Sequence, residues 1–295
     1  MRTVEGMDPV NHRSGRSPDL SRVTVVLPAL NEAAALPTAL ASFPPETNLV
    51  VVDNGSTDTT AAVAARLGAR VVFEPRRGFG AACLAGVHAA PDAEVIAFAD
   101  ADGSFDGADL AAVAGPVLDG TADLVLGSRL AGQRTPGAMS PLAVLENRLL
   151  ACVCRVGFGV RLSDLGPFRA IRRDALLALG IRDRAQGWPL EMVARAARAG
   201  LRIAEVPVSY HPRAGGASKV SGSLPGTLRA AWDMAVVTAR LALRTFPDLR
   251  ALPALRIPGP GPGPGGRRTS SPAHGNGEGR SPQTVIHSPH QRKSG

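Results

Sequence analysis

The chain has 295 residues, of which 44% are hydrophobic and 4% aromatic, and its formal net charge is +8. This apolar content is typical of a globular core, and no apolar run reaches the roughly 20 residues of a membrane-spanning helix. Seven Lys or Arg residues and only two acids lie after residue 246, so the high basic charge mostly describes a tail, and we expect no nucleic-acid partner. The three cysteines lack a disulfide-like spacing, which favours a cytoplasmic protein.

Residues 1–20 are polar, and we expect them to be disordered. From Val23 onwards, apolar strand-like runs alternate with helical patterns, which predicts an α/β fold with a mainly parallel sheet and helices on both faces. The expected strands are VTVVLPA, LVVVD, RVVFE, EVIAFAD, DLVLGS and RIAEVPV, and the expected helices span residues 32–42, 57–67, 80–88 and 108–118.

Polar residues follow three of these strands at the point where each strand ends. Asn31 and Glu32 follow the first strand, Asp53 closes the second, and Asp100 and Asp102 follow the run EVIAFA. Open α/β sheets bind their ligands outside the carboxyl ends of the strands. We therefore expect these side chains to converge on one ligand site.

Asp100 and Asp102 are separated by one residue, so in an extended stretch their side chains point the same way. Because an isolated desolvated charge is costly, they either lie in water or hold a cation. Their hard oxygen ligands favour Mg²⁺ or Mn²⁺, which retain waters and bridge to substrate phosphates. The pair therefore predicts a divalent-metal site that holds a diphosphate.

The stretch EPRRGFGAACLAG resembles a dinucleotide-binding fingerprint only in part. Cys83 stands where the third glycine is needed, and the stretch does not follow the first strand, so we disfavour a nicotinamide cofactor. Arg76 or Arg77 could still reach a phosphate beside a glycine turn that lets backbone approach it.

A second glycine-rich stretch, YHPRAGGASKVSG, follows the last expected strand. Arg213, Ser218 and Lys219 lie in it, and basic groups on a flexible backbone suit a diphosphate. His211 is either a third metal ligand or a surface histidine.

The carboxyl-terminal part divides into two regions. Residues 224–243 combine an apolar stripe with a cationic face, so this predicted helix either packs on the sheet or lies on an acidic membrane surface. Residues 247–295 are basic and rich in Pro and Gly, and we expect them to be disordered. The single globular domain should therefore span residues 21–246.

Taken in order, these motifs resemble family 2 glycosyltransferases, within the branch of dolichyl-phosphate mannosyl- and glucosyltransferases. The resemblance covers roughly residues 22–246 and implies a single-domain GT-A fold, a nucleotide-sugar donor and a divalent metal. The motifs that carry it are VVLPALNEAAAL, NLVVVDNGSTDTT, RGFGAACLAG, AFADADGSFD, VLGSR, SDLGPFRAIRR, GWPLEMVARAARAGLRIAEVPV and RAGGASKVSG.

The resemblance also implies roles for individual residues. Asp53 would recognise the base, Asp100 and Asp102 would hold the metal on the diphosphate, and the loop with Lys219 would close over that diphosphate. The residues implied to bind the donor are Pro28, Asn31, Glu32, Asp53, Arg77, Asp100, Arg213, Ser218 and Lys219.

Two departures from the family pattern bear on the substrates. Ser104 stands where many mannosyl members carry Gln, which weakens a mannosyl assignment and slightly favours UDP over GDP. The acid pair of many inverting relatives is replaced by GWPLEM, which favours an ionised acceptor such as a polyprenyl phosphate, because a phosphate needs no general base. For a hydroxyl acceptor the base candidates are Glu191 and Asp164, although Glu191 could equally be a first-turn acid favoured by the helix dipole.

The sequence therefore predicts a metal-dependent, inverting hexosyltransferase that moves a hexose from a UDP- or GDP-sugar to a lipid phosphate or another acceptor, with Asp102 acting through the metal. It would be cytoplasmic, either free or peripheral at the inner face of the membrane. A sugar-nucleotide nucleotidyltransferase is an alternative, but PALNEAAALP stands where its glycine-rich signature should follow the first strand. A non-catalytic nucleotide-sugar-binding protein is another, and the intact Asp100–Asp102 pair disfavours it.

Overall fold

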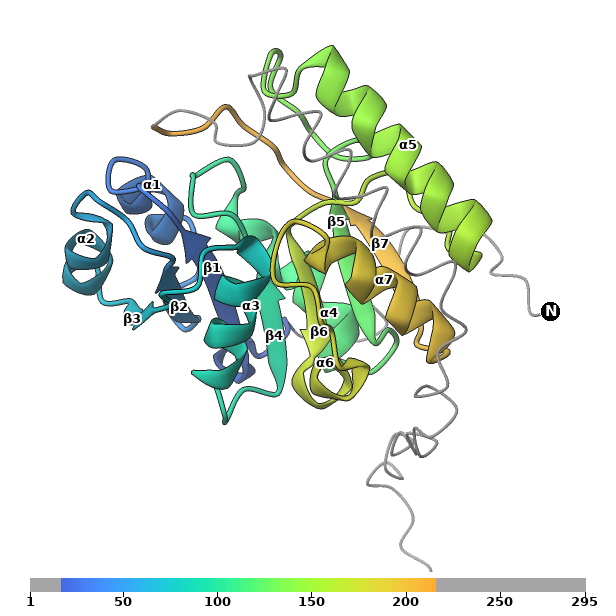
Figure 1. Cartoon of the computed structure of the whole chain (residues 1–295), viewed down its shortest axis with the longest axis horizontal. Coiled ribbons are helices and arrows are strands. Elements are labelled where there is room, and N and C mark those ends of the chain that lie inside the picture. The colour runs from blue at the N-terminus through green and yellow to red at the C-terminus, as the bar shows by residue number, and fades with distance from the viewer. Residues whose placement is uncertain (1–16, 216–295) are drawn as a thin grey trace, which may run out of the picture. The chain divides into compact units, whose positions relative to one another are not determined.

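The computed structural model describes residues 17–215. At its centre is a seven-stranded sheet in the order β3-β2-β1-β4-β6-β5-β7, with helices on both faces (Figure 1). The strands are β1 (Val23–Ala29), β2 (Asn48–Asp53), β3 (Arg70–Phe73), β4 (Val95–Phe98), β5 (Leu124–Ser128), β6 (Arg169–Arg172) and β7 (Ile203–Pro207). The α-helices are α1 (Leu36–Ala41), α2 (Thr60–Arg66), α3 (Phe79–His88), α4 (Leu110–Leu118), α5 (Pro141–Phe158), α6 (Arg173–Leu179) and α7 (Trp188–Arg198), and short 3₁₀ helices span Leu20–Arg22 and Gly107–Asp109.

The pairing of the strands confirms the predicted α/β class with a mixed, mainly parallel sheet. β1 pairs in parallel with both β2 and β4, β2 with β3, and β5 with β7. β6 runs antiparallel between β4 and β5. Its sequence is RAIR, which lacks the apolar run of a central strand, so the pattern did not predict it.

Two apolar layers sandwich the sheet. On one face, helices α1, α2 and α4 cover side chains such as Val25 and Val51. On the other face, α3, α6 and α7 cover Val26, Val52 and Ile96. Neighbouring residues of β1 and β2 thus point to opposite faces, as the two-residue period of a strand requires. Both faces are dry, which explains the continuous apolar runs of the central strands.

The elements differ from the predictions in several places, of which three bear on the domain. The helix expected from residue 32 begins at Leu36, because the preceding residues form turns against the loop after β2. The eighteen-residue helix α5 was not predicted at all. Leu20 was assigned to the amino-terminal segment but is buried in the core.

Several predicted features lie outside the described residues. They are the segment 1–16, Ser218, Lys219, the helix expected at 224–243 and the tail 247–295. Within residues 17–215, no helix combines the length and apolar character needed to cross a bilayer.

The close approach of α3 to the sheet predicts a stability difference between two helical glycines. A Cβ at Gly86 would lie 2.3 Å from Val26 Cγ1, whereas nothing lies within 4 Å of a Cβ at Gly157 in α5. We expect Gly86→Ala to lower the free energy of unfolding by about 1–3 kcal/mol through overpacking. Gly157→Ala should be neutral or stabilise the protein by up to about 1 kcal/mol, because Ala is the better helix former. Urea unfolding of both variants checks this, and equal effects would contradict the close packing of α3.

Candidate functional site

The loop after β1 is joined to the loop after β2 by side-chain hydrogen bonds. The Asn31 backbone N–H donates to Ser56 Oγ (2.9 Å), and Asn31 Oδ1 accepts from the Thr57 N–H (2.7 Å). The Glu32 N–H donates to Thr60 Oγ1 (2.9 Å). Asn31 has a φ of 53°, a left-handed conformation that Asn adopts more readily than most residues. These bonds bring together two of the strand ends that the sequence predicted to converge.

Asp53 and Asn54 are both buried at the end of β2, and each side chain bonds a different loop. Asp53 Oδ1 accepts from the Ser56 N–H (2.8 Å), which fixes the carboxylate at the edge of the sheet. The Asn54 amide donates to the carbonyls of Glu74 (2.9 Å) and Arg76 (2.8 Å) and accepts from the Gly78 N–H (2.8 Å). Asn54 therefore holds the loop between β3 and α3 against the Asp53 turn.

Asn54 was not among the residues singled out from the sequence, so this positioning role was missed. The only signal in the sequence was an Asn-Gly pair directly after the apolar run LVVVD. The result of this contact is that Arg77 lies over the turn: a Cβ at Gly55 would be 3.3 Å from Arg77 Nε. Arg77 thus lies against the turn that follows Asp53.

The glycine turn before α3 corrects one expectation. Instead of leaving room for a phosphate, Gly78 and Gly80 allow the loop before α7 to approach closely, since a Cβ at Gly78 would lie 2.1 Å from the Arg184 carbonyl oxygen. The first N–H groups of α3 donate to that loop, from Gly80 to the Ala185 carbonyl (3.1 Å) and from Ala81 to the Arg184 carbonyl (3.0 Å). Because these donors are already used, the start of α3 is not a phosphate site.

Asp100 and Asp102 lie just beyond the carboxyl end of β4. Asp102 is buried; its Oδ1 accepts from the Ser104 N–H (2.9 Å), and its Oδ2 lies 2.9 Å from Arg213 Nη1. Arg213 Nη2 also donates to Glu32 Oε1 (2.7 Å). One guanidinium, which lies 181 residues after Glu32 in the sequence, therefore joins the end of β4 to the loop after β1.

The carboxyl ends of β1, β2 and β4 and the loops that follow them form one edge of the sheet, which we call the rim. The backbone of the segment after β7 is hydrogen-bonded to this rim. The Ala214 N–H donates to the Asp102 carbonyl (2.9 Å), and the His211 N–H donates to the Ser104 carbonyl (2.8 Å). The His211 side chain is exposed and its Nδ1 lies 3.0 Å from Thr135 Oγ1, which favours a surface role over that of a metal ligand.

Asp100 lies in a partly buried position close to the carboxylate of Asp102, and both features disfavour the ionisation of Asp100. Burial, then the charge of Asp102, raises the pKa of Asp100 to about 7, while Arg129 and Arg213 oppose the shift. A divalent cation would relieve this repulsion, and the oxygen donors suit Mg²⁺ or Mn²⁺. Residues 17–215 contain no cluster of three or more His, Cys, Asp or Glu arranged to hold a metal. A cation held here would take its other ligands from water and phosphate, so the donor set fits a metal shared with a diphosphate.

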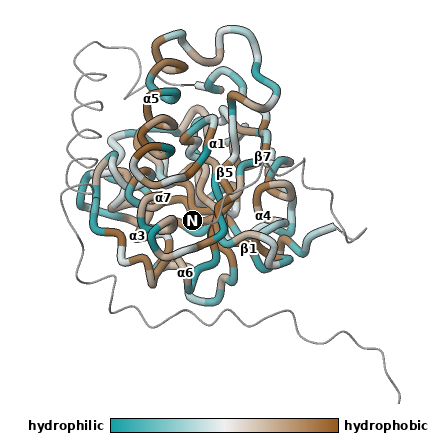
Figure 2. The backbone as a smooth tube through the Cα atoms, turned by 90° about the vertical axis from the view of Figure 1, so that its right-hand side faces the viewer, coloured by the Kyte–Doolittle hydropathy of each residue, from teal (hydrophilic) through white to brown (hydrophobic). Residues whose placement is uncertain are grey.

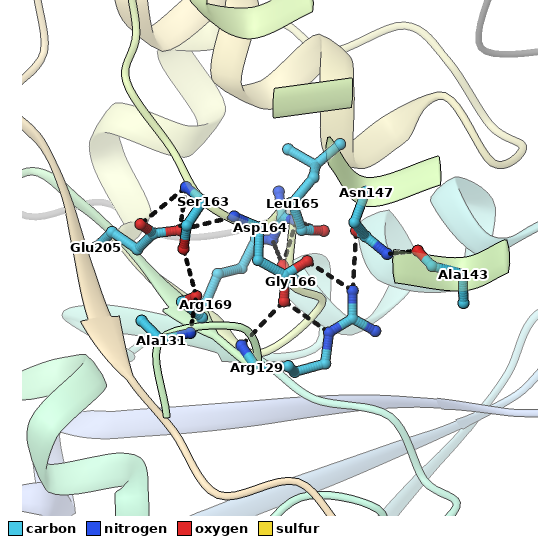
Figure 3. Close-up of polar contacts among 11 residues, drawn as sticks. Arg129, Ala131, Ala143, Asn147, Ser163, Asp164, Leu165, Gly166, Arg169 and Glu205 are labelled. Atoms are coloured by element: carbon cyan, nitrogen blue, oxygen red, sulfur yellow. Dashed lines mark hydrogen bonds and ion pairs between the residues drawn. The ribbon is translucent and has the colours of Figure 1, made fainter. Parts of the chain in front are cut away.

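Both carboxylate oxygens of the buried Asp164 are hydrogen-bonded by Arg129 (Figure 3). The carboxylate accepts from Arg129 Nε (2.7 Å), Nη2 (2.8 Å) and the backbone N–H (2.9 Å). Arg129 Nη2 also donates to Asn147 Oδ1 (3.0 Å), and the guanidinium carbon lies 5.4 Å from the Tyr210 ring centroid. Asp164 therefore positions the Arg129 guanidinium at the rim. These contacts do not support the expected role of Asp164 as a general base. Arg129 itself was missed because its motif, VLGSR, carries no pattern beyond a strand end.

Glu191 also serves the scaffold. Its Oε2 accepts from the N–H groups of Arg182 (3.1 Å) and Asp183 (2.7 Å), and its Oε1 accepts from Arg195 Nε (2.6 Å). Glu191 thus shapes the loop that covers the start of α3. This supports the helix-acid interpretation over the catalytic base.

The structure therefore brings most of the predicted site residues to one edge of the sheet. Pro28 lies inside β1 opposite Val52, one strand residue before that edge. Glu191 and Asp164 are engaged elsewhere. The residues gathered at the edge are Asn31, Glu32, Asp53, Arg77, Asp100, Asp102 and Arg213.

Comparisons with known proteins bear on this site. The family model described as Glycosyl transferase family 2 matches residues 24–179. The chain is similar to an uncharacterized glycosyltransferase of Mycobacterium tuberculosis, with 50% identity over 72% of this chain and 95% of that protein. It is also similar to the undecaprenyl-phosphate mannosyltransferase of Micrococcus luteus, with 32% identity over 70% of this chain and 90% of that one.

Among solved structures, the chain resembles the glucosyl-3-phosphoglycerate synthase of Mycobacterium tuberculosis in complex with Mn²⁺ and uridine-diphosphate-glucose. The TM-score is 0.60 and the identity 26%, and the match covers 75% of this chain and 78% of that one.

The Glu191 network predicts a large loss of stability from one substitution. Glu191→Ala removes the carboxylate that accepts from the buried Arg195 Nε and from two backbone N–H groups, so we expect the free energy of unfolding to fall by about 3 kcal/mol or more. The matched control is Glu94→Ala, which removes a pair with Arg22 whose side chains are each 46% exposed, and it should cost less than about 1 kcal/mol. Chemical denaturation measures both. A stable but inactive Glu191→Ala protein would restore the general-base role.

Proposed function

The chain belongs to glycosyl transferase family 2, and we propose that it transfers a hexose from a UDP- or GDP-linked donor to a polyprenyl phosphate, with inversion at the sugar carbon. Family membership and the GT-A fold confirm the resemblance read from the motifs, and the protein is a glycosyltransferase. The proposal for its substrates and residues depends mainly on one observation: Asp100 and Asp102 lie beside Arg213 at the edge of the sheet that also carries Asp53 and Arg77.

The donor would lie across the carboxyl ends of β1, β2 and β4. Asp53 would accept hydrogen bonds from the base, with Arg77 beside it, and the diphosphate would extend towards Asp100 and Asp102. The complex of the similar synthase with Mn²⁺ and UDP-glucose supports this class of donor. The Ser104 position continues to favour UDP slightly over GDP.

Asp100 and Asp102 would hold Mg²⁺ or Mn²⁺. When bound, the metal neutralises charge that develops on the diphosphate as the sugar–phosphate bond breaks. Arg213 already spans Glu32 and Asp102, and we propose that it turns towards the diphosphate when donor and metal are bound. Ser218 and Lys219, which follow it in sequence, would add to the same anion site.

The acceptor is inferred from the absence of an available base among the candidates. Asp164 is neutralised by Arg129, and Glu191 is held by Arg195 and two N–H groups. A hydroxyl acceptor would need a base to remove its proton, whereas a phosphate arrives as a nucleophilic anion. The similarity to an undecaprenyl-phosphate mannosyltransferase supports this acceptor class.

We propose that residues 21–246 form the catalytic domain, with the polar ends 1–20 and 247–295 outside it. The burial of Leu20 supports an amino-terminal limit at, or just before, residue 20.

Thermal shift of the full chain tests the donor. UDP-glucose, GDP-mannose and NADH are each added with and without Mn²⁺. We expect the midpoint to rise only when one nucleotide-sugar and Mn²⁺ are present together, because each neutralises the charge of the other in the site. A rise with NADH, or a metal-independent rise, would contradict the proposed donor site.

Asp102→Asn tests the metal site in a turnover assay with undecaprenyl phosphate. The change keeps an oxygen that can accept from the Ser104 N–H but removes the charge, so turnover should fall at least about 100-fold. The unfolding midpoint should change little. Asp92→Asn is the matched control because that exposed residue precedes β4 at the opposite edge of the sheet. Full activity of Asp102→Asn, or turnover unaffected by a chelator, would rule out the metal mechanism, and turnover with phosphoglycerate in place of the lipid would rule out the proposed acceptor.

A further inference from the structure

Helix α5 carries a continuous apolar stripe on its outer face. Within residues 17–215, seven large hydrophobic side chains are exposed, and four of them are on this one helix. Leu142, Leu145, Leu149 and Val156 are 51%, 54%, 59% and 80% exposed, and Cys152 between them is also exposed. Their spacing of three and four residues places all five on one side of the helix. We call these five residues the α5 stripe.

The opposite face of α5 holds the helix to the domain. Ala151 and Cys154 are buried, and Asn147 accepts from Arg129 while its own amide donates to the Ala143 carbonyl (2.8 Å). Figure 1 shows α5 at the periphery of the described domain, and Figure 2 shows hydrophobic residues along it. The α5 stripe therefore points away from the core, and exposed apolar surface of this kind marks an interaction site.

The charges around the α5 stripe are positive. Arg148 and Arg155 are exposed on the same helix, and Arg161 is exposed just after it. Glu146 is the one acid of α5, and it is partly buried, with a pKa that burial raises. An apolar stripe with arginines beside it and no exposed acid is the pattern of a helix that lies in an anionic lipid interface.

Charge also decides between the candidate occupants. A second copy of the chain would bring the same arginines against Arg148 and Arg155, and like charges oppose that contact. Residues 224–243 contain two arginines and one aspartate, so this segment has the same sign of charge as the face it would cover. Anionic lipid is the occupant whose charge is complementary.

We propose that the α5 stripe docks the protein on the surface of an anionic bilayer, with α5 lying in the plane of the interface. Asn147, on the inner face of α5, links the helix to Arg129 at the rim of the site, so docking through the α5 stripe places the rim one helix diameter, roughly 10 Å, from the docked surface. The phosphate of a polyprenyl acceptor lies in the headgroup layer of that surface. The consequence for the acceptor rests on the proposed function, whereas membrane binding through α5 does not depend on it.

Vesicle co-sedimentation of the full chain tests the docking, without donor or acceptor. Vesicles contain phosphatidylcholine alone or with phosphatidylglycerol. We expect binding that needs phosphatidylglycerol and falls with salt. The double variant Leu145→Gln/Leu149→Gln should lower the partition coefficient at least about tenfold, because it removes two apolar anchors from the interface.

The matched control is Leu67→Gln/Leu177→Gln, which changes two leucines that are 44% and 40% exposed on other elements and should bind as the unchanged protein does. Because all four leucines are exposed, both variants should keep the unfolding midpoint, and Arg148→Glu/Arg155→Glu provides a second test through charge.

Three outcomes would overturn the docking surface. The unchanged protein could fail to bind phosphatidylglycerol vesicles. The α5 variants could bind as well as the control, which would show that another segment makes the membrane contact. Sedimentation equilibrium could instead show a dimer that Leu145→Gln/Leu149→Gln dissociates, which would make a second copy the occupant. Normal vesicle binding without transfer to undecaprenyl phosphate would contradict the proposed function and leave the docking surface intact.

Discussion

Parallel pairing of β1 with β2 and β4 is the constraint from which the site follows. Because these strands run in one direction, the residues after each of them meet at one edge of the sheet, although they come from positions as distant as Asn31 and Asp102. Local hydrogen bonds then define the rim: Asn31 joins the first two loops, and Arg213 joins the first to the end of β4. No single loop could form this arrangement by itself.

Three buried carboxylates of residues 17–215 are paired with arginines: Asp164 and Asp123 pair with arginines from other segments, whereas Glu191 pairs with an arginine one turn further along α7. An unpaired buried charge would cost several kcal/mol, so these contacts are structural in the first place. Arg169 differs in that its guanidinium donates to the backbone carbonyls of Gly166 and Pro189, and burial lowers its pKa to about 10. The side-chain pairs are Arg129–Asp164, Arg195–Glu191 and Arg202–Asp123.

The rim is where this rule of charge balance is relaxed. Asp100 and Asp102 lie together, and burial followed by the charge of Asp102 raises the pKa of Asp100 by more than the nearby arginines lower it. Sites that bind charged ligands carry such an imbalance, because the ligand or its metal completes it. The exposed leucines of α5 are the apolar counterpart: a surface whose favourable partner lies outside the chain.

The sequence by itself determined the α/β class and placed polar residues at the ends of the parallel strands. Both follow from local properties: the runs of apolar residues that form strands, and the polar residues that end those runs. The sequence could not determine β6, whose four residues RAIR form a strand only because β4 and β5 leave a place between them. Nor could it assign Glu191 and Asp164, which looked equally suited to catalysis or to the scaffold. Only the tertiary structure decided that, by placing Arg129 against Asp164 and the loop N–H groups of Arg182 and Asp183 against Glu191. Arg195 follows Glu191 at the local i, i+4 spacing of a helix, but the other partners come from segments that only packing brings together.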